Sequence, residues 1–364
     1  MALRRTVTAL GAVTLVAGLG LTALSGEGSS TASAAPATTT SSPAAPDPVI
    51  PATPDAPATP AAAPVIARVA GGDRYETAAK IAVEHLARHG AVDAVYLATG
   101  RDFPDALTGG ALAASQGNPV LLTRPGGLPG VTRTALETLG RPRVYVLGGE
   151  SAVNGTVLDE LAAMGITATR VAGPNRYETA AQVSRMLAPS EIVYVATGDN
   201  YPDALAAVPA AGLDASPVLL TRHGSLPGAA VNELRRHDPR LVVVMGGTVA
   251  VGTDVVDQIW DLGYEPLRVA GNDRFQTAAA LSGVWPSGSS TAWVATGMDF
   301  ADALAAGPAA AAEGGAIVLT RQASLPGATA TTLLGLTPRE VRVLGGTVAI
   351  DPAVEDQIAA LPWG

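Results

Sequence analysis

The sequence predicts an α/β protein of three tandem modules, each built on a parallel sheet of the Rossmann-like or flavodoxin-like kind. Short runs of Val, Leu, Ile and Tyr alternate with stretches of helical spacing, which is typical of a parallel sheet covered on both faces. The same motifs recur at intervals near a hundred residues, the length of a domain. The chain has 364 residues, 48% of them hydrophobic, which is sufficient for two or three cores.

The repeated text sets the predicted module boundaries. The segment RVAGGDRYETAA at Arg68 returns as RVAGPNRYETAA at Arg170 and as RVAGNDRFQTAA at Arg268. The motifs ATG-xx-F/Y-x-DAL, PVLLTR (AIVLTR in the third copy) and V-x-V-L/M-GG follow in the same order in each copy. We therefore expect modules at residues 65–166, 167–264 and 265–364.

The elements of the first module can be assigned in order. VIARVAG is strand-like, and DRYETAAKIAVEHLARHG has helical spacing, with Asp73 as the N-cap and Glu76 as its capping-box partner. AVYLATG is the second strand, and PDALTGGALAAS is a helix with Pro in its first turn. NPVLLT and RVYVLGG are the third and fourth strands, each followed by a helix, and ITATRVAG opens the next module. The other modules repeat this order, with Asn175 and Asp273 as the expected caps.

The first module is slightly longer than the others. About four extra residues lie in HLARHGAVDA, where the first helix meets the second strand. They amount to about one helical turn of ~3.6 residues, so we expect the core to be unaffected.

The N-terminal 64 residues predict export and a tether. Residues 1–34 have a basic start, an apolar run and small residues ending in ASA, the pattern of a cleavable signal peptide. A retained membrane anchor is the alternative, because the apolar run approaches spanning length. Residues 35–64 are rich in Pro, Ala, Thr and Ser and predict a disordered tether.

Composition argues against several functional classes. A formal net charge of −9 and a pI near 4.9 make a general nucleic-acid-binding surface improbable. The chain has no cysteine, which excludes disulfides, thiolate metal sites and cysteine nucleophiles. None of its four histidines recurs in all three modules, and the glycine pairs do not form a dinucleotide fingerprint. We expect no metal, no cofactor and no catalytic residue.

The candidate site residues are polar side chains that recur near the carboxyl ends of the strands, where ligands bind to open parallel sheets. They are Arg74, Arg176 and Arg274; Thr123, Thr221 and Thr320 with Arg124, Arg222 and Arg321; Asp105, Asp203 and Asp302; and Thr99, Thr197 and Thr296.

Structural roles are open for several of them. The aspartates of the DAL motif could cap their helices or pair with an arginine. Arg74 and its equivalents could pair with that aspartate and fix one loop to another. Arg124 and its equivalents lie in variable Gly/Pro-rich turns, which favours contact with a ligand or with another module. Arg68, Arg170 and Arg268 lie within predicted strands, which favours a structural ion pair or a contact at an interface.

Together these motifs resemble the cell wall-binding repeat 2 family, over about residues 65–364. The resemblance implies three Rossmann-like modules around a pseudo-threefold axis that attach non-covalently to an anionic secondary polymer of a Gram-positive wall. It also implies grooves between neighbouring modules near Pro119–Leu122 and Pro217–Leu220; the third copy, Ala316–Leu319, lacks the proline.

We accordingly expect a secreted, cell-surface protein that binds the wall polymer or peptidoglycan through the recurring arginines and the Thr123 group. The Asp105 and Thr99 groups could be structural or binding. A second protein could supply an effector activity. The alternatives are a secreted wall hydrolase with a carboxylate site, and a soluble ligand-binding or adhesion protein.

Overall fold

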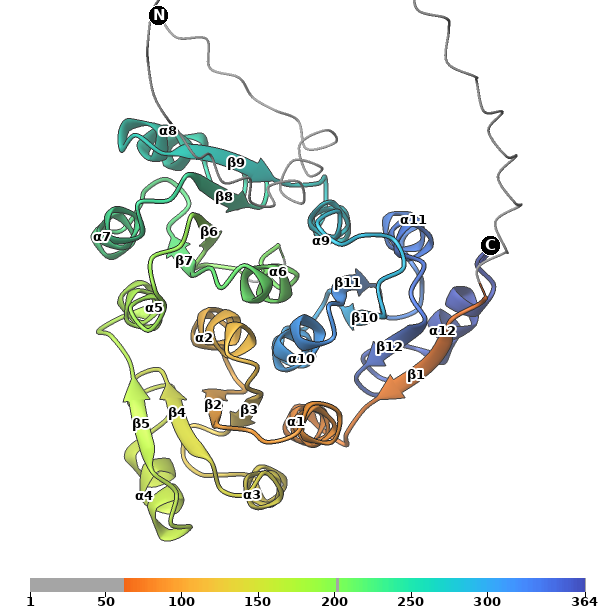
Figure 1. The fold of residues 1–364 in the computed structure, drawn as a ribbon, viewed down its shortest axis with the longest axis horizontal. Coiled ribbons are helices and arrows are strands. Elements are labelled where there is room, and N and C mark those ends of the chain that lie inside the picture. The colour runs from red at the N-terminus through yellow and green to blue at the C-terminus, as the bar shows by residue number, and fades with distance from the viewer. Residues whose placement is uncertain (1–61, 201–202, 364) are drawn as a thin grey trace, which may run out of the picture.

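A computed structural model of the chain describes residues 62–200 and 203–363, and these form three four-stranded parallel sheets arranged in a ring (Figure 1). The expected signal peptide, 1–34, and nearly all of the tether, 35–64, lie outside the described residues. The three-module α/β fold that the sequence predicts is confirmed. In the part of the chain described, no helix combines the length and apolar character that crossing a membrane requires.

The sheets have equivalent strand orders, β3-β2-β4-β5, β7-β6-β8-β9 and β11-β10-β12-β1. The strands of the first order are Val120–Thr123, Ala94–Thr99, Arg143–Leu147 and Ala168–Val171. Those of the second are Val218–Thr221, Ile192–Thr197, Leu241–Met245 and Glu265–Val269. Those of the third are Ala316–Thr320, Thr291–Thr296, Glu340–Leu344 and Val65–Val69. Central strands such as β2 and β10 are buried throughout, as both-face coverage requires.

The sheets are offset by one strand from the repeated text. The strand that opens the second repeat, β5, pairs with β4 of the first, and β9 likewise pairs with β8. The first strand of the described chain, β1, pairs with β12 of the third repeat. The division into modules 65–166, 167–264 and 265–364 therefore stays a prediction about the repeated sequence, and each sheet takes its fourth strand from the next repeat around the ring.

The helices occupy three positions in each repeat (Figure 1). Inner helices meet at the centre of the ring: α2 (Pro104–Ser115), α6 (Ala207–Leu213) and α10 (Ala301–Ala312). Seam helices lie between neighbouring sheets: α1 (Arg74–His89), α5 (Arg176–Ser184) and α9 (Arg274–Ser282). Outer helices cover the periphery: α3 (Gly130–Thr138), α4 (Gly155–Ala163), α7 (Gly228–His237), α8 (Thr253–Asp261), α11 (Gly327–Leu336) and α12 (Pro352–Ala359). We call the junctions at α5, α9 and α1 seam 1/2, seam 2/3 and seam 3/1.

The predicted helix starts of the seam helices are confirmed. The Asp73 carboxylate accepts a hydrogen bond from the Glu76 N–H at 2.9 Å, and Asn175 and Asp273 cap α5 and α9 in the same way. The Glu76 carboxylate reaches back to the N–H of Gly72, one residue before the N-cap, so the reciprocal half of the box is displaced by one position.

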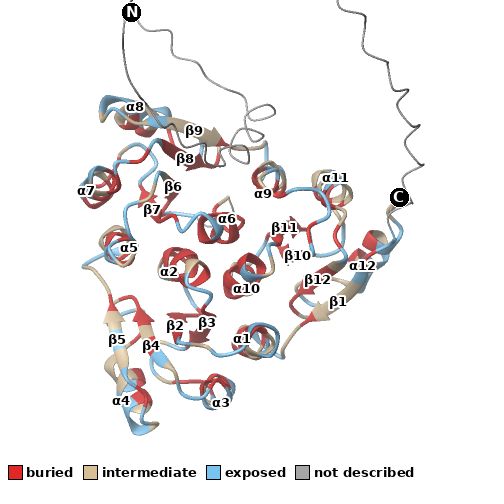
Figure 2. Ribbon diagram, viewed as in Figure 1, coloured by how far each residue is buried: buried red, intermediate tan, exposed pale blue. Residues whose placement is uncertain are grey.

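The inner helices are rich in Ala and Gly because they approach one another closely. One core cluster joins all three repeats, and the inner helices are buried on nearly every side (Figure 2). At one level of the axis the equivalent residues are Gly110, Val208 and Gly307. A Cβ on Gly307 would lie 2.3 Å from Val208 Cγ1, so one valine fills space that three side chains cannot share.

The extra residues of the first repeat lengthen α1. This helix has 16 residues, whereas α5 and α9 have nine each. The insertion therefore extends a seam helix and leaves the sheets equivalent, as expected.

Candidate functional site

The recurring polar residues gather at the carboxyl ends of the strands, on one rim of the ring. Each repeat places there an arginine that follows its third strand and an aromatic residue from the first turn of its seam helix. The Arg124 guanidinium lies 5.0 Å from the centre of the Tyr75 ring. Arg222 lies 4.8 Å from Tyr177 and Arg321 lies 4.7 Å from Phe275. We call these pairs rim sites 1, 2 and 3.

The arginines of the rim sites are accessible. The side chains of Arg124 and Arg321 are 55% and 52% exposed, and each is 3.9–4.0 Å from the capping aspartate, Asp73 or Asp273. The second repeat has Asn175 at that position. A guanidinium that lies over an aromatic ring is held by cation–π attraction, and its N–H donors suit carboxylate or phosphate oxygens.

The aromatic half of each rim site was missed in the sequence interpretation. A signal was present, because Tyr or Phe always follows Arg in the R-Y/F-x-T motif. The structure also explains the invariant glycine of ATG. A Cβ on Gly100 would lie 2.7 Å from the Tyr75 ring, so only glycine lets the ring lie against the strand end.

The threonines before these arginines are buried. Thr123, Thr221 and Thr320 are fully buried, and their hydroxyls donate to backbone carbonyls within the same turn. The Thr221 hydroxyl, for example, lies 2.9 Å from the carbonyl of Ser225. Direct polymer contact was expected for these threonines, but their burial is inconsistent with it. They are positioning residues that shape the turn carrying the arginine.

Thr99, Thr197 and Thr296 are also structural. Each is buried at the end of its strand, and its hydroxyl accepts the N–H two residues further on, at 3.2–3.3 Å. These bonds fix the start of the loop that carries the DAL motif.

Arg74, Arg176 and Arg274 join neighbouring repeats and neighbouring loops. The Arg74 guanidinium donates to the carbonyl of Gly100 and to the carboxylate of Asp299, both within 2.8 Å. It also lies 5.6 Å from the centre of the Phe300 ring. Arg176 binds Gly198, Asp102 and the Phe103 ring in the same manner, and Arg274 binds the carbonyl of Gly297.

The expected partner of these arginines was the aspartate of DAL, and the observed partner is the acidic residue three positions earlier. Asp299 and Asp102 serve seam 3/1 and seam 1/2, and Asn200 stands at the equivalent position of the second repeat. Only part of each arginine is exposed, so the structure gives these residues a role at the seams.

The aspartates of DAL are buried across the same seams. Asp105 lies in the first turn of α2, whose N-cap is Phe103, and accepts a hydrogen bond from Thr179 of the next repeat. Asp203 and Asp302 bind Thr277 and Thr77 equivalently. Their carboxylates fill the space beside the first glycine of each GG pair: a Cβ on Gly148, which has φ +95°, would lie 2.3 Å from Asp105 Oδ2.

Burial changes the titration of these carboxyls. Burial, and secondarily the nearby Asp102 charge, raise the pKa of Asp105 to about 6, against opposing effects of Arg176 and Thr179. Burial and Asp299 raise the pKa of Asp302 to about 6 in the same way. Burial also raises the pKa of Asp203.

The strand arginines have the structural role that the sequence favoured. Arg68 pairs with Glu355 of α12 at 2.7 Å and donates to the carbonyl of Gly345. Arg170 and Arg268 donate to the carbonyls of Gly148 and Gly246. These contacts fix the loop after the fourth strand.

The second repeat contains a buried polar cluster that the other repeats lack. The Ser184 hydroxyl lies 2.8 Å from His237 Nε2 and 3.0 Å from Glu233, and all three residues are at least 96% buried. Burial lowers the pKa of His237 to about 4. Because this trio lies in the interior between α5 and α7, it supports a packing role. Over residues 62–200 and 203–363 no three acidic or histidine side chains gather as metal ligands would.

Each repeat of the chain matches the family described as cell wall binding domain 2 (CWB2). The matches cover residues 68–158, 170–256 and 268–355. The chain is 26% identical over 293 residues to N-acetylmuramoyl-L-alanine amidase LytC of Bacillus subtilis, covering 80% of this chain and 58% of that protein.

Solved structures show the same fold. Cwp6 from Clostridium difficile has a TM-score of 0.74 at 24% identity, over 82% of this chain and 48% of that one. Cwp8 from Clostridium difficile has a TM-score of 0.73 at 25% identity, over 81% of this chain and 51% of that one. The chain thus spans about half the length of the proteins it matches.

Proposed function

The chain belongs to the cell wall binding domain 2 family, and from this we propose that it is a secreted protein that attaches non-covalently to the bacterial wall through three rim sites. The proposed ligand is an anionic secondary wall polymer. The protein acts by binding and performs no catalysis of its own. A second protein could use it as an anchor.

The supporting observation is the arginine that lies over an aromatic ring in every repeat. Arg124, Arg222 and Arg321 are exposed guanidinium groups that rings hold in place, so little conformational entropy is lost when an oxyanion binds. Three such sites on one ring facing a repetitive polymer raise one another's effective concentration. Linked sites can gain about 10²–10⁴ in avidity, so weak single contacts suffice.

The negative net charge of the protein is consistent with binding to an anionic polymer only if the attraction comes from local groups. A net charge of −9 repels an anionic polymer at long range, but screening limits that repulsion to about 8 Å at physiological salt. Attraction then comes from groups that reach the polymer directly, which the exposed rim arginines do.

The test removes the three rim guanidiniums together. We expect Arg124→Ala, Arg222→Ala and Arg321→Ala in one chain to abolish sedimentation with purified walls while the circular dichroism spectrum is unchanged. Each single variant should weaken binding by about tenfold, because two sites remain.

A matched triple variant controls for charge. Arg143, Arg240 and Arg339 are exposed at the amino ends of the fourth strands, on the opposite side of the sheets. Their replacement by Ala removes the same three charges and should leave sedimentation intact. Equal loss in both variants would show a general charge effect, and undiminished binding by the folded rim variant would refute the assignment. Walls stripped of secondary polymers by mild acid should no longer bind the parent protein if the polymer is the ligand.

A second candidate is a wall hydrolase, which the pairs Asp102–Asp105 and Asp299–Asp302 favour. In each pair one carboxyl is solvent-accessible while the other has a pKa near 6, a division typical of acid–base catalysis. We rank it second because Asp105 and Asp302 lie under the GG turns and bind threonines across seams. Release of reducing ends or free amino groups from walls, lost in Asp105→Asn/Asp302→Asn, would favour the hydrolase.

A further inference from the structure

The ring is closed by a strand that has no short covalent link to its sheet. Strands β5 and β9 follow directly on α4 and α8, which belong to the sheets that they complete. Strand β1 instead joins β12 from the opposite end of the described chain, with Val65 opposite Glu340 and Val69 opposite Leu344. The third sheet therefore holds its fourth strand by non-covalent contacts alone. The other two sheets are also joined to their fourth strands by the continuous chain.

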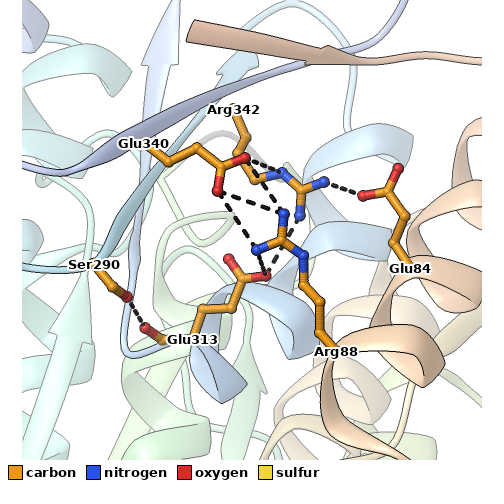
Figure 3. Close-up of polar contacts among 6 residues, drawn as sticks. All are labelled: Glu84, Arg88, Ser290, Glu313, Glu340 and Arg342. Carbon is orange, nitrogen blue, oxygen red and sulfur yellow. Dashed lines mark hydrogen bonds and ion pairs between the residues drawn. The ribbon is translucent and has the colours of Figure 1, made fainter. Parts of the chain in front are cut away.

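Charged side chains fill this seam (Figure 3). Arg342 of β12 is 4% exposed and pairs with Glu84 of α1 and, at 3.4 Å, with Glu313 at the end of α10. Arg88, on the extended part of α1, lies 3.4 Å from Glu340 and 3.5 Å from Glu313. The insertion in the first repeat thus supplies one member of the cluster.

Two of the five positions, those of Arg342 and Glu84, are uncharged at both other seams. Glu313 corresponds to Gln116 and Asp214, and Glu340 corresponds to Arg143 and Leu241. Arg342 corresponds to Tyr145 at seam 1/2 and to Val243 at seam 2/3. Glu84 corresponds to Met186 and to Val284. At seam 1/2 the Tyr145 ring stacks on Tyr96 at 5.1 Å. Seam 2/3 is lined by aliphatic residues and Tyr194, whose hydroxyl donates to Asp214 at 3.0 Å.

The charged seam is incompletely paired. Glu313 Oε2 and Trp293 Nε1 are buried without a hydrogen-bond partner, and Arg342 Nε has only an ion pair with Glu340 at 3.5 Å. A buried polar group without a partner destabilises the fold, and desolvation offsets much of the attraction within a buried ion cluster. Seams 1/2 and 2/3 bury mainly apolar and aromatic surface, which stabilises without this offset. Seam 3/1 should therefore open at the lowest cost.

Rim site 1 adjoins seam 3/1, and rim site 2 adjoins seam 1/2. The Arg74 side chain crosses seam 3/1 to Asp299 and Phe300, and Tyr75 of rim site 1 follows it directly in α1. The corresponding contact of rim site 2, Arg176 with Asp102, crosses seam 1/2.

We propose that β1 and the cluster of Glu84, Arg88, Glu313, Glu340 and Arg342 form a releasable strap, which closes the ring and thereby governs whether rim site 1 is assembled. Its effect on wall attachment rests on the proposed function. With the strap open, the protein has two assembled sites instead of three.

Hydrogen exchange of the full chain, measured by mass spectrometry, tests the strap. Strands β1, β5 and β9 are equivalent edge strands, so β5 and β9 are internal controls. We expect amides of β1 to exchange at least about tenfold faster than those of β5 and β9, since local opening free energies differ between regions of one protein. Equal protection of the three strands would overturn the proposal.

A charge-neutral variant tests the cluster itself. Glu84→Met/Arg342→Met removes one charge of each sign, keeps unbranched side chains, and leaves Arg88 to pair with Glu313 and Glu340. We expect β1 exchange to slow toward the rate of β5. The control Tyr145→Val/Met186→Val, at seam 1/2, should leave β1 exchange unchanged. Unaltered or faster β1 exchange in a folded Met variant would overturn the role of the cluster.

If the Met variant does not fold, the ratio among β1, β5 and β9 in the parent chain decides alone. The exchange measurement contains no wall material, so a failure of wall binding leaves its result, and the strap, untouched.

Discussion

At the residue scale, the recurring motifs divide into residues that face solvent and residues that hold those in place. Arg124, Arg222 and Arg321 are exposed on the rim, whereas the neighbouring threonines and the aspartates of DAL are buried. The recurrence of a residue in all three repeats does not show which class it belongs to. The residues that shape the turn recur as strictly as the arginine that the turn presents.

The buried aspartates make stability depend on pH. The pKa values of Asp105 and Asp302 in the folded protein, about 6, exceed the ordinary value of 3.8, so between those pH values the folded chain binds more protons than the unfolded chain. Stability should therefore fall as pH rises through 4–6, by up to about 3 kcal/mol for each carboxyl. Urea unfolding from pH 4.5 to 7.5 measures this.

Substitutions identify the groups responsible. Asp105→Asn/Asp302→Asn should flatten the pH dependence, because the amide mimics the protonated carboxyl. Asp159 is exposed, so Asp159→Asn serves as a control and should preserve the pH dependence. An unchanged slope in the double variant would contradict the assignment.

At the element scale, the inner helices depend on unequal residues at equivalent positions. Only one of Gly110, Val208 and Gly307 carries a side chain, and both glycines face that valine. Gly307→Val should destabilise the protein by about 1–3 kcal/mol through overpacking. Val208→Gly/Gly307→Val should recover much of that loss, because it restores one valine at the axis. Thermal unfolding of the two variants tests this, and equal destabilisation would refute shared axial packing.

The seam helices differ in how well they fill the space against the neighbouring sheet. A cavity of about 20 Å³ remains at seam 2/3, lined by Val243, Val284 and other apolar residues. Val284→Met introduces the residue found at seam 1/2 and should stabilise by about 0.5–2 kcal/mol if it fits without strain. The reverse change, Met186→Val, should destabilise. Denaturant midpoints report both, and a lower midpoint for Val284→Met would show that the cavity cannot take the longer chain.

At the whole-molecule scale, closure of the ring depends on β1, the first strand of the described chain. A chain that begins at residue 65 should retain the parent's thermal stability within about 2 °C. A chain that begins at residue 74 lacks β1 and Arg68 and exposes the edge of β12. It should melt about 5 °C or more lower and self-associate through that edge. Thermal scans and light scattering distinguish the two, and identical behaviour would show that β1 is dispensable.

The sequence by itself determined the α/β class, the three repeats, the helix caps and the candidate arginines, because these depend on local chemistry: side-chain alternation, cap residues and turn glycines act within a few residues. Only the tertiary structure decided which sheet each opening strand joins, which acid each seam arginine binds, and that aromatic rings support the rim arginines. These are contacts between repeats or between distant segments. Three similar copies give a strand or an arginine several partners of the same local pattern, and only packing around a closed ring selects among them.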